Sequence, residues 1–134
     1  ELEAVRRLTT DAPAETAAEL REILARQATV ATPETYDIFD SIDRDFHRKL
    51  YERTGILQLW ASVRRQSVHL DRLRRLHLPM PGKMQTVLGD HETIVEGIAS
   101  GRLADAEAAL RKHLSGTLSN IDVISSEFPT YVRV

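Results

Sequence analysis

Residues 36–50 read YDIFDSIDRDFHRKL, and this stretch decides the fold class. Its apolar residues recur every three or four positions, which is the spacing of one face of an α-helix. They are Tyr36, Phe39, Ile42, Phe46 and Leu50. The preceding Thr32-Pro33 predicts the helix start, with Thr32 as N-cap and Pro33 at the first helical position. The helix is expected to end near Gly55.

The same apolar spacing continues along almost the whole chain, and no segment alternates in the way of a half-buried strand. It predicts a first helix that ends near Asp11-Ala12-Pro13 and a second helix through residues 17–27. After the helix of residues 36–50, three more are expected at about residues 56–77, 84–99 and 103–126. Six amphipathic helices joined by short loops predict an all-α fold, an antiparallel bundle.

Composition excludes several function classes. The 134 residues predict one domain, residues 1–134. Eighteen Lys and Arg against 20 Asp and Glu give a net charge of −2, which argues against a dedicated nucleic-acid binder. The chain has no cysteine, so disulfides, thiolate metal sites and cysteine nucleophiles are excluded. No apolar run approaches a membrane span and no signal peptide is recognised. Because there is no initial Met, we expect a fragment or a trimmed chain.

Four polar residues occupy positions where a bundle helix should be apolar. Asp43 and His47 are four apart, so they share a helix face with Phe39, Phe46 and Leu50. His91 lies in the apolar stripe of the helix at residues 84–99, and His113 in that of the helix at residues 103–126. One carboxylate and three imidazoles are therefore expected to point inward from three helices. An unpaired buried carboxylate is costly, so Asp43 must have a partner.

Two interpretations fit this set of residues. One Asp oxygen and three His nitrogens suit a borderline divalent ion, with zinc as first choice and nickel, manganese or cobalt as alternatives. Four ligands close a tetrahedron, or leave two open positions in an octahedron for water or a small carboxylate. Alternatively, the four residues form a buried hydrogen-bonded network without a metal.

The helix at residues 56–77 adds a second polar position. Its inward stripe is expected to be Leu59, Val63, Gln66, Leu70 and Leu73. A central glutamine either bonds a buried water or lines a polar cavity beside the metal, and we rank Gln66 first among contacts to a bound molecule. The further candidates, ranked lower, are Ser62, Arg65, His69, Thr117 and Asn120.

Three motifs carry a family resemblance. Residues 43–47, DRDFH, resemble the D-x-x-F-H motif of the FadR-type C-terminal (FCD) ligand-binding domain of GntR-family bacterial transcription regulators. Residues 90–94, DHETI, resemble its E-H-x-x-I motif, and residues 106–114, AEAALRKHL, its A-x-x-A-[ML]-x-x-H-[LI] segment. Their order and spacing match the family over essentially the whole chain, although Ile56 replaces a frequent Asn.

The resemblance implies a bundle of six or seven helices in which Asp43, His47, His91 and His113 hold a metal ion. It implies a small carboxylic acid effector beside that metal, and dimerisation through this domain. Trp60 and Tyr131 offer apolar surface for a homodimer. The expected function is effector sensing in a cytoplasmic regulator. DNA would be bound only through a winged helix-turn-helix that precedes the domain in the intact protein and is absent from this chain.

Two other functions remain open at this point. A small metal-dependent hydrolase could use the same Asp and His ligands, although no inward-facing residue is placed as a general base. Glu92 adjoins His91 and therefore points about 100° away from it on a helix. A plain helical interaction module would need only the buried polar network. We expect no enzyme activity.

Overall fold

The computed structural model describes residues 1–11 and 14–132, and every regular element within them is helical. The α-helices are α1 (Leu2–Asp11), α2 (Ala14–Ala28), α3 (Tyr36–Arg53), α4 (Leu57–Gln66), α5 (Val68–His77), α6 (Lys83–Ala99), α7 (Leu103–Ser115) and α8 (Ile121–Glu127). Two 3₁₀ turns, η1 (Pro33–Thr35) and η2 (Leu118–Asn120), lead into α3 and α8. The predicted all-α class is confirmed, and Thr32 does precede the first turn before α3. Part of the predicted end of the first helix, Ala12-Pro13, lies outside the described residues.

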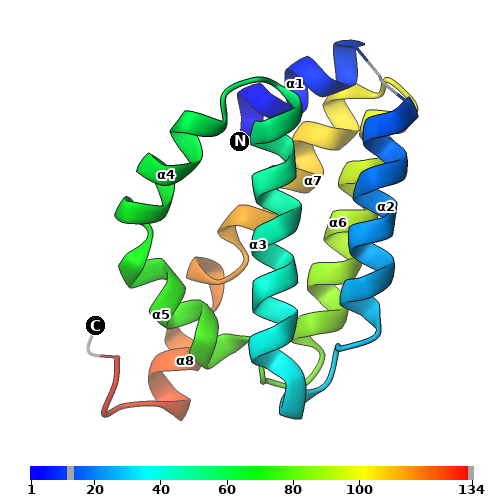
Figure 1. Cartoon of the computed structure of the whole chain (residues 1–134). Coiled ribbons are helices and arrows are strands. Elements are labelled where there is room, and N and C mark those ends of the chain that lie inside the picture. The colour runs from blue at the N-terminus through cyan, green and yellow to red at the C-terminus, as the bar shows by residue number, and fades with distance from the viewer. Residues whose placement is uncertain (12–13, 133–134) are drawn as a thin grey trace.

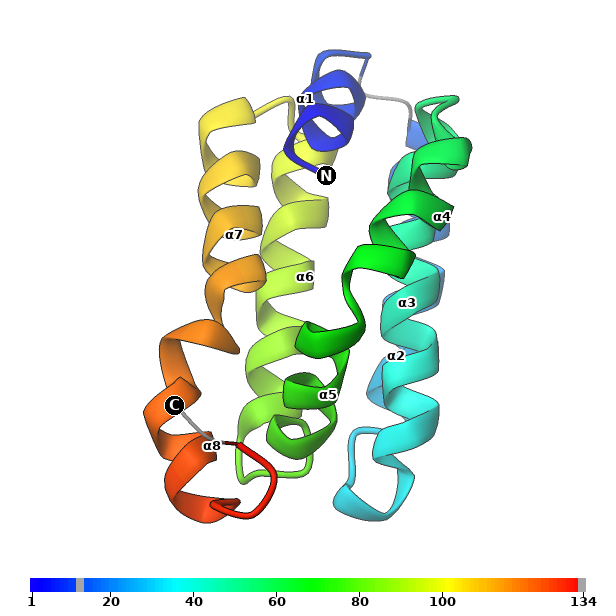
Figure 2. The same ribbon diagram turned by 90° about the vertical axis from the view of Figure 1, so that its left-hand side faces the viewer.

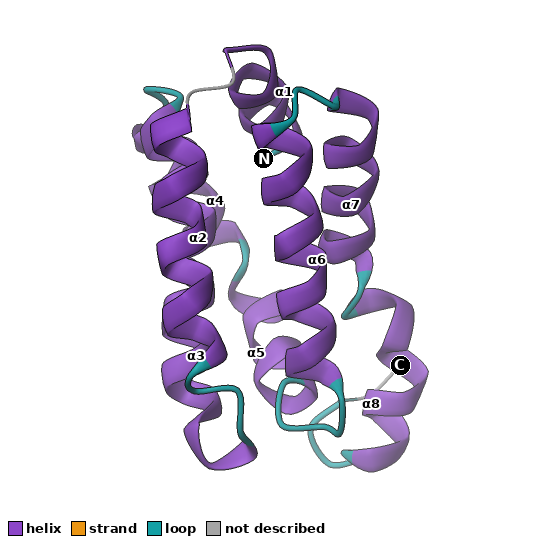
Figure 3. Cartoon of the chain, turned by 90° about the vertical axis from the view of Figure 1, so that its right-hand side faces the viewer, coloured by secondary structure: helices purple, strands orange, loops and turns teal. Residues whose placement is uncertain are grey.

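The bundle has a tightly packed part and an outer layer. α2, α3 and α6 stand side by side while α1 crosses one end of the bundle (Figure 1). α6 packs against α7, α2 and α1, and α2 packs against α3. Seen from one side, α4 and α5 form an outer layer over α3 and α6 (Figure 2). The opposite face is formed by α2, α6 and α7 (Figure 3).

The main core is built from the apolar stripes that the sequence predicts. It includes Leu20 of α2, Phe46 and Leu50 of α3, Ile94 of α6 and Leu110 of α7, none of which is exposed. Each fully buried side chain of this size contributes about 1.5–3 kcal/mol. A second cluster around Phe39, Leu78, Met84 and Val87 fills the end of the bundle at the α5–α6 connection.

The α6–α7 crossing depends on a glycine. A Cβ at Gly97 would lie 2.8 Å from the Cβ of Ala106 and 2.9 Å from its backbone N and Cα. These distances are shorter than van der Waals contact, so the two helices approach this closely only because residue 97 has no side chain.

The predicted helix at residues 56–77 is broken in the structure. α4 ends at Gln66, α5 begins at Val68, and the Ser67 Oγ donates a 2.7 Å hydrogen bond to the Val63 carbonyl. A helical wheel assumes one unbroken helix. Because the helix breaks at Ser67, the spacing of residues in α5 does not show which residues of α4 face inward. The expected inward stripe is therefore wrong for Leu59, which is 49% exposed, and for Gln66, which is also exposed. No residue of α4 is fully buried.

The predicted last helix is divided as well. α7 ends at Ser115, and η2 separates it from α8. The described chain thus has eight α-helices, more than the six or seven expected. None of the described helices combines the length and apolar character that are needed to cross a lipid bilayer.

His77 closes α5 as a buried, uncharged residue. Its side chain is 6% exposed, and its Nδ1 has no hydrogen-bond partner among the described residues. Burial lowers the pKa of His77 to about 4, and the nearby Lys83 cation adds to this shift. The imidazole is therefore neutral at pH 7.

We expect Gly97→Ala to destabilise the fold by about 1–3 kcal/mol, because overpacking forces close helices apart. The matched control is Gly89→Ala on the same helix, where an added Cβ meets no atom within 4 Å. The control should gain up to about 1 kcal/mol, since alanine has the higher helix propensity. Chemical denaturation measures both, and equal midpoints for the two variants would contradict the close packing.

Acidification from pH 6.5 to pH 4 should destabilise the fold through His77. The unfolded imidazole, with a pKa of about 6.5, takes up its proton before the folded one. The unfolded state therefore binds more protons in this window. As the pH is lowered from 6.5 to 4, the free energy of unfolding decreases by about 1–3 kcal/mol through this residue. Denaturation across this pH range should show a shallower slope for His77→Gln than for the parent. The control is His69→Gln, at an exposed position, which should keep the parental slope. If His77→Gln also kept the parental slope, a buried, neutral His77 would not be the cause of the acid destabilisation.

Candidate metal centre

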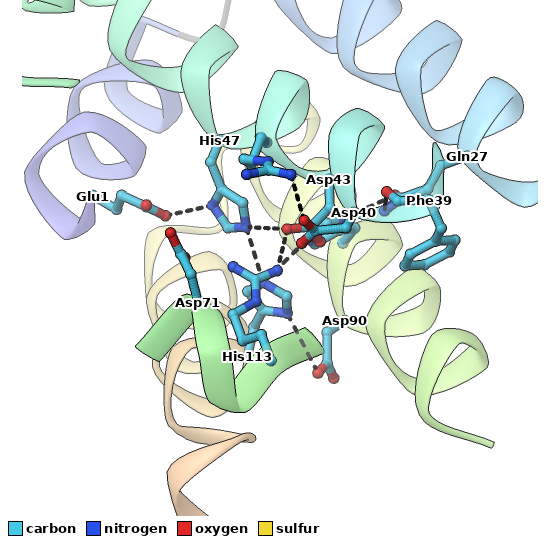
Figure 4. A network of polar contacts seen from close by, with 12 residues as sticks. Glu1, Gln27, Phe39, Asp40, Asp43, His47, Asp71, Asp90 and His113 are labelled. Atoms are coloured by element: carbon cyan, nitrogen blue, oxygen red, sulfur yellow. Dashed lines mark hydrogen bonds and ion pairs between the residues drawn. The ribbon is translucent and has the colours of Figure 1, made fainter. Parts of the chain in front are cut away.

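The four polar residues that the sequence singles out come together in the core. α3 contributes Asp43 and His47, α6 contributes His91, and α7 contributes His113. One ligand atom from each lies within 4.8 Å of the others, and none of the four side chains is more than 9% exposed. The convergence predicted from three helix faces is therefore observed, and Figure 4 shows Asp43, His47 and His113 within it.

The ring nitrogens that meet are all Nε2 atoms. The Nε2 of His113 lies 3.1 Å from that of His47 and 3.2 Å from that of His91. The Asp43 carboxylate completes the group, with Oδ1 at 3.6 Å from His91 Nε2 and Oδ2 at 3.7 Å from His47 Nε2. Ligand atoms at about 2.1 Å from one ion lie about 3.0 Å apart at right angles and about 3.4 Å apart at the tetrahedral angle. The observed spacings therefore fit a shared divalent ion.

Hydrogen-bond acceptors face the outer ring nitrogens. Glu1 Oε2 lies 2.6 Å from His47 Nδ1, Gln27 Oε1 lies 3.2 Å from His91 Nδ1, and Asp90 Oδ2 lies 3.8 Å from His113 Nδ1. Figure 4 shows Glu1 and Asp90 on opposite sides of the cluster. The acceptors at 2.6 and 3.2 Å favour the proton on Nδ1 of His47 and of His91 when these rings are neutral. Their Nε2 atoms then turn lone pairs toward the Nε2 of His113, an arrangement that a cation among the three nitrogens would stabilise.

The Gln27 amide is oriented by a contact of its own. Its Nε2 donates to the Phe39 carbonyl oxygen at 3.5 Å, which turns Oε1 toward His91. Gln27 is fully buried, and so is His91, whose ring stacks on Phe46 with a centroid distance of 3.9 Å. The ring of His91 is thus fixed by packing on one side and by a hydrogen bond at its edge.

Asp43 has one oxygen paired and one oxygen free. Arg74 of α5 donates to Oδ2, whereas the buried Oδ1 has no hydrogen-bond partner among the described residues. Burial acts to raise the pKa of Asp43, but Arg74 and the three histidines outweigh it and hold that pKa well below its usual range. Asp43 is therefore a carboxylate, and an unpartnered buried oxygen 3.6 Å from His91 Nε2 fits a metal ligand.

The histidines differ in their proton affinity. Burial lowers the pKa values of His91 and His113, which keeps both rings neutral, as metal binding requires. Burial also acts on His47, but the Glu1 and Asp43 carboxylates outweigh it and raise the pKa of His47. Without a metal, a proton on His47 Nε2 can supply the cation that the cluster needs.

A hollow of about 360 Å³ opens beside His47 under α4 and α5. Trp60 of α4 and Tyr51 of α3 form its aromatic wall, with ring centroids 5.6 Å apart. Arg64 lies over the Trp60 ring at 5.5 Å and is paired with Asp71, while Arg74 separates the hollow from Asp43. Trp60 is thus half-buried at this hollow. Another hollow, of about 760 Å³, lies on the outer face of α2, α6 and α7; its lining includes Asp90 but none of the four candidate ligands.

The residues expected to contact an effector are mostly elsewhere. Gln66, Arg65 and His69 are exposed, and Ser62 accepts a 3.0 Å hydrogen bond from Arg65. Asn120 is also exposed and donates to the Gly116 carbonyl at 2.7 Å. Thr117 differs from these five, because it is buried and lines a small hollow next to His113.

Sequence reasoning missed the residues that surround the ligands. Glu1, Gln27, Asp90 and Arg74 each contact one of the four core residues. The only sequence signals were that buried Asp43 needs a partner, that Gln27 lies in the apolar stripe of its helix, and that Asp90 precedes His91. None of these signals identifies which residue is contacted.

Comparison with known proteins connects this centre to a family. A family model described as the FCD domain matches residues 1–116. An "Uncharacterized HTH-type transcriptional regulator in unstable DNA locus" of Streptomyces ambofaciens is 30% identical over 111 residues. The match covers 83% of this chain and 46% of the relative, so the chain spans about half the length of the curated relative.

The comparisons also bear on the functional classes that the sequence left open. The FCD domain and the regulator relative point to a non-enzymatic transcription regulator rather than to a metal-dependent hydrolase that uses the same Asp and His ligands. The matched region includes all four converging residues and the helices that carry them. The chain belongs to the FCD domain family.

Proposed function

We propose that this chain is the metal-containing, effector-sensing domain of a transcriptional regulator. Asp43, His47, His91 and His113 would hold one divalent ion, and a small organic acid would bind beside it. The observation that supports this most strongly is the set of three Nε2 lone pairs and one unpartnered Asp43 oxygen around a single point. A hydrogen-bonded network without a metal would need an additional proton among these nitrogens, for which His47 Nε2 is the candidate.

Zinc is our first choice for the ion, with nickel, manganese and cobalt as alternatives. Three imidazole nitrogens and one carboxylate oxygen suit this borderline group of metals and disfavour calcium or magnesium, which prefer all-oxygen sites. The outer partners Glu1, Gln27 and Asp90 would raise the basicity of the imidazoles and hold their rings in place. The chain itself therefore supplies both the ligands and the groups that orient them.

A small carboxylic acid suits the surroundings of this centre. A divalent ion with one carboxylate ligand would carry a net charge of +1, and in an octahedral arrangement it would keep two positions for an anionic oxygen. The hollow beside His47 gives access from under α4, with Arg64 and Arg74 as cations and Trp60 and Tyr51 as apolar walls. These four residues replace Gln66 as the proposed contacts of the effector, because the Gln66 side chain is exposed.

The remaining proposals concern the intact protein. The relative is named as an HTH-type regulator, so we infer that effector binding here controls DNA binding by a helix-turn-helix domain in a cytoplasmic homodimer. Such control requires that the effector bind two arrangements of the domains with different affinity. Dimerisation stays a prediction; Tyr131 is 67% exposed, but Trp60 packs within the chain.

We expect zinc-reconstituted protein to bind one ion per chain, and His91→Ala to lose at least about tenfold in affinity. At free zinc 100 times the Kd, the parent should gain about 2.7 kcal/mol of stability, because only the folded state has the site. Metal content by atomic emission and melting with and without chelator measure both effects. His69→Ala, at an exposed histidine, is the control and should match the parent. The same zinc content and the same chelator effect in His91→Ala would rule out this centre.

A panel of small carboxylic acids should raise the melting temperature of the metal-loaded protein and not that of the stripped protein. Trp60→Ala should weaken the best acid by about five- to tenfold, since it removes an aromatic wall. Gln66→Leu on the same helix is the control and should bind as the parent does. Isothermal titration measures the affinities. Stabilisation that is independent of the metal would refute an acid at the metal, and an unaffected Trp60→Ala would remove this hollow as its entrance.

A further inference from the structure

A second hollow lies on the other side of Arg74, between α5, α6 and α7. Its volume is about 40 Å³, enough for a single carboxylate-sized group. Its polar lining consists of Arg74, Lys83, His113 and Thr117, and its other walls are apolar. No carboxylate is among its lining residues in the described part of the chain. The larger hollow differs, because Glu1 and Asp71 line it.

Lys83 differs from the other lysines of this chain. Lys49 is paired with Glu19 and Glu52, and Lys112 lies 2.7 Å from Asp90. Half-buried Lys83 has no carboxylate oxygen within 4.0 Å among the residues that the structure describes. Burial lowers the pKa of Lys83, and the more distant Asp90 and Asp43 carboxylates oppose this shift without cancelling it.

The two hollows are adjacent and share three lining residues, Leu70, Arg74 and Leu114. His47 lines the larger one and His113 lines the smaller one, so both border the metal centre. A short molecule that binds at the centre can therefore extend past Arg74 into the hollow of Lys83.

The charges around the centre match a dianion. Counting only side chains and a divalent ion, the ion, Arg74 and Lys83 carry four positive charges, against two negative charges on Asp43 and Glu1. Arg64 with Asp71, Arg44 with Asp40, and Lys112 with Asp90 are neutral pairs. The loaded site thus has a net charge of +2, which a monocarboxylate would neutralise only by half.

We infer that the effector is a short dicarboxylic acid, with one carboxylate at the metal centre and the other in the small hollow against Lys83 and Thr117. This inference rests on the proposed function, because it needs the metal-bound acid as its first contact. It assigns Lys83 as the residue that distinguishes a dicarboxylate from a monocarboxylate of the same size.

The test compares succinate with succinamate, its monoamide of nearly equal size, by isothermal titration into zinc-loaded protein. The parent should bind succinate at least about tenfold more tightly, as expected for one added charge-assisted hydrogen bond in a partly buried site. Lys83→Met should lower this ratio to about one to three while leaving zinc content and succinamate affinity unchanged. Lys83→Arg should keep the preference. Lys49→Met removes the same charge from a lysine that lines neither hollow, and should keep the parental ratio.

Three outcomes are distinguishable. Loss of the preference in Lys83→Met alone supports the inference. The inference is overturned if the zinc-loaded parent binds both acids equally, or if Lys83→Met keeps the preference for succinate. Either result leaves the proposed function intact. Protein that binds neither zinc nor either acid refutes the proposed function, and the assignment of Lys83 is overturned with it.

Discussion

The centre depends on three imidazoles whose Nε2 atoms lie within 3.2 Å of a neighbour, so that their lone pairs face one another wherever these nitrogens carry no proton. Lone pairs this close repel, so the arrangement needs helices rigid enough to hold the rings and a cation to lie among them. The close α6–α7 crossing at Gly97, the stacking of Phe46 on His91 and the buried Gln27 provide the rigidity. The Asp43 carboxylate, held by Arg74, provides a negative charge that a cation can balance.

Much of this fold was predictable, because an amphipathic helix encodes its buried face in its own sequence. The four-residue spacing of Asp43 and His47 places both on the face of Phe46, whatever else the chain does. His91 and His113 are buried for the same reason, each within the apolar stripe of one unbroken helix. Periodicity fails where a helix breaks. Ser67 divides α4 from α5, so the position of Gln66 could not be extrapolated from Leu70 and Leu73.

The groups around the ligands were not predictable for a different reason. Glu1 lies 46 residues from His47, Gln27 64 residues from His91, and Arg74 31 residues from Asp43. No local pattern links residues so far apart, and the chain offers many arginines and acids of equal local character. Their selection is made by helix packing, which brings α1, α2 and α5 against the faces of α3 and α6.

α4 lies in the outer layer of the bundle, whereas the four candidate ligands lie in its core. α4 carries Trp60 over the hollow, yet none of its residues is fully buried, while Asp43, His47, His91 and His113 are at most 9% exposed. Local opening of α4 therefore costs far less free energy than opening of the helices that hold the ligands. In the proposed function, the opening of α4 would set how fast an effector enters and leaves, while the helices that hold Asp43, His47, His91 and His113 stay closed. Substitutions in α4 that change how easily it opens would then alter the residence time of such an effector without any change in the four candidate ligands.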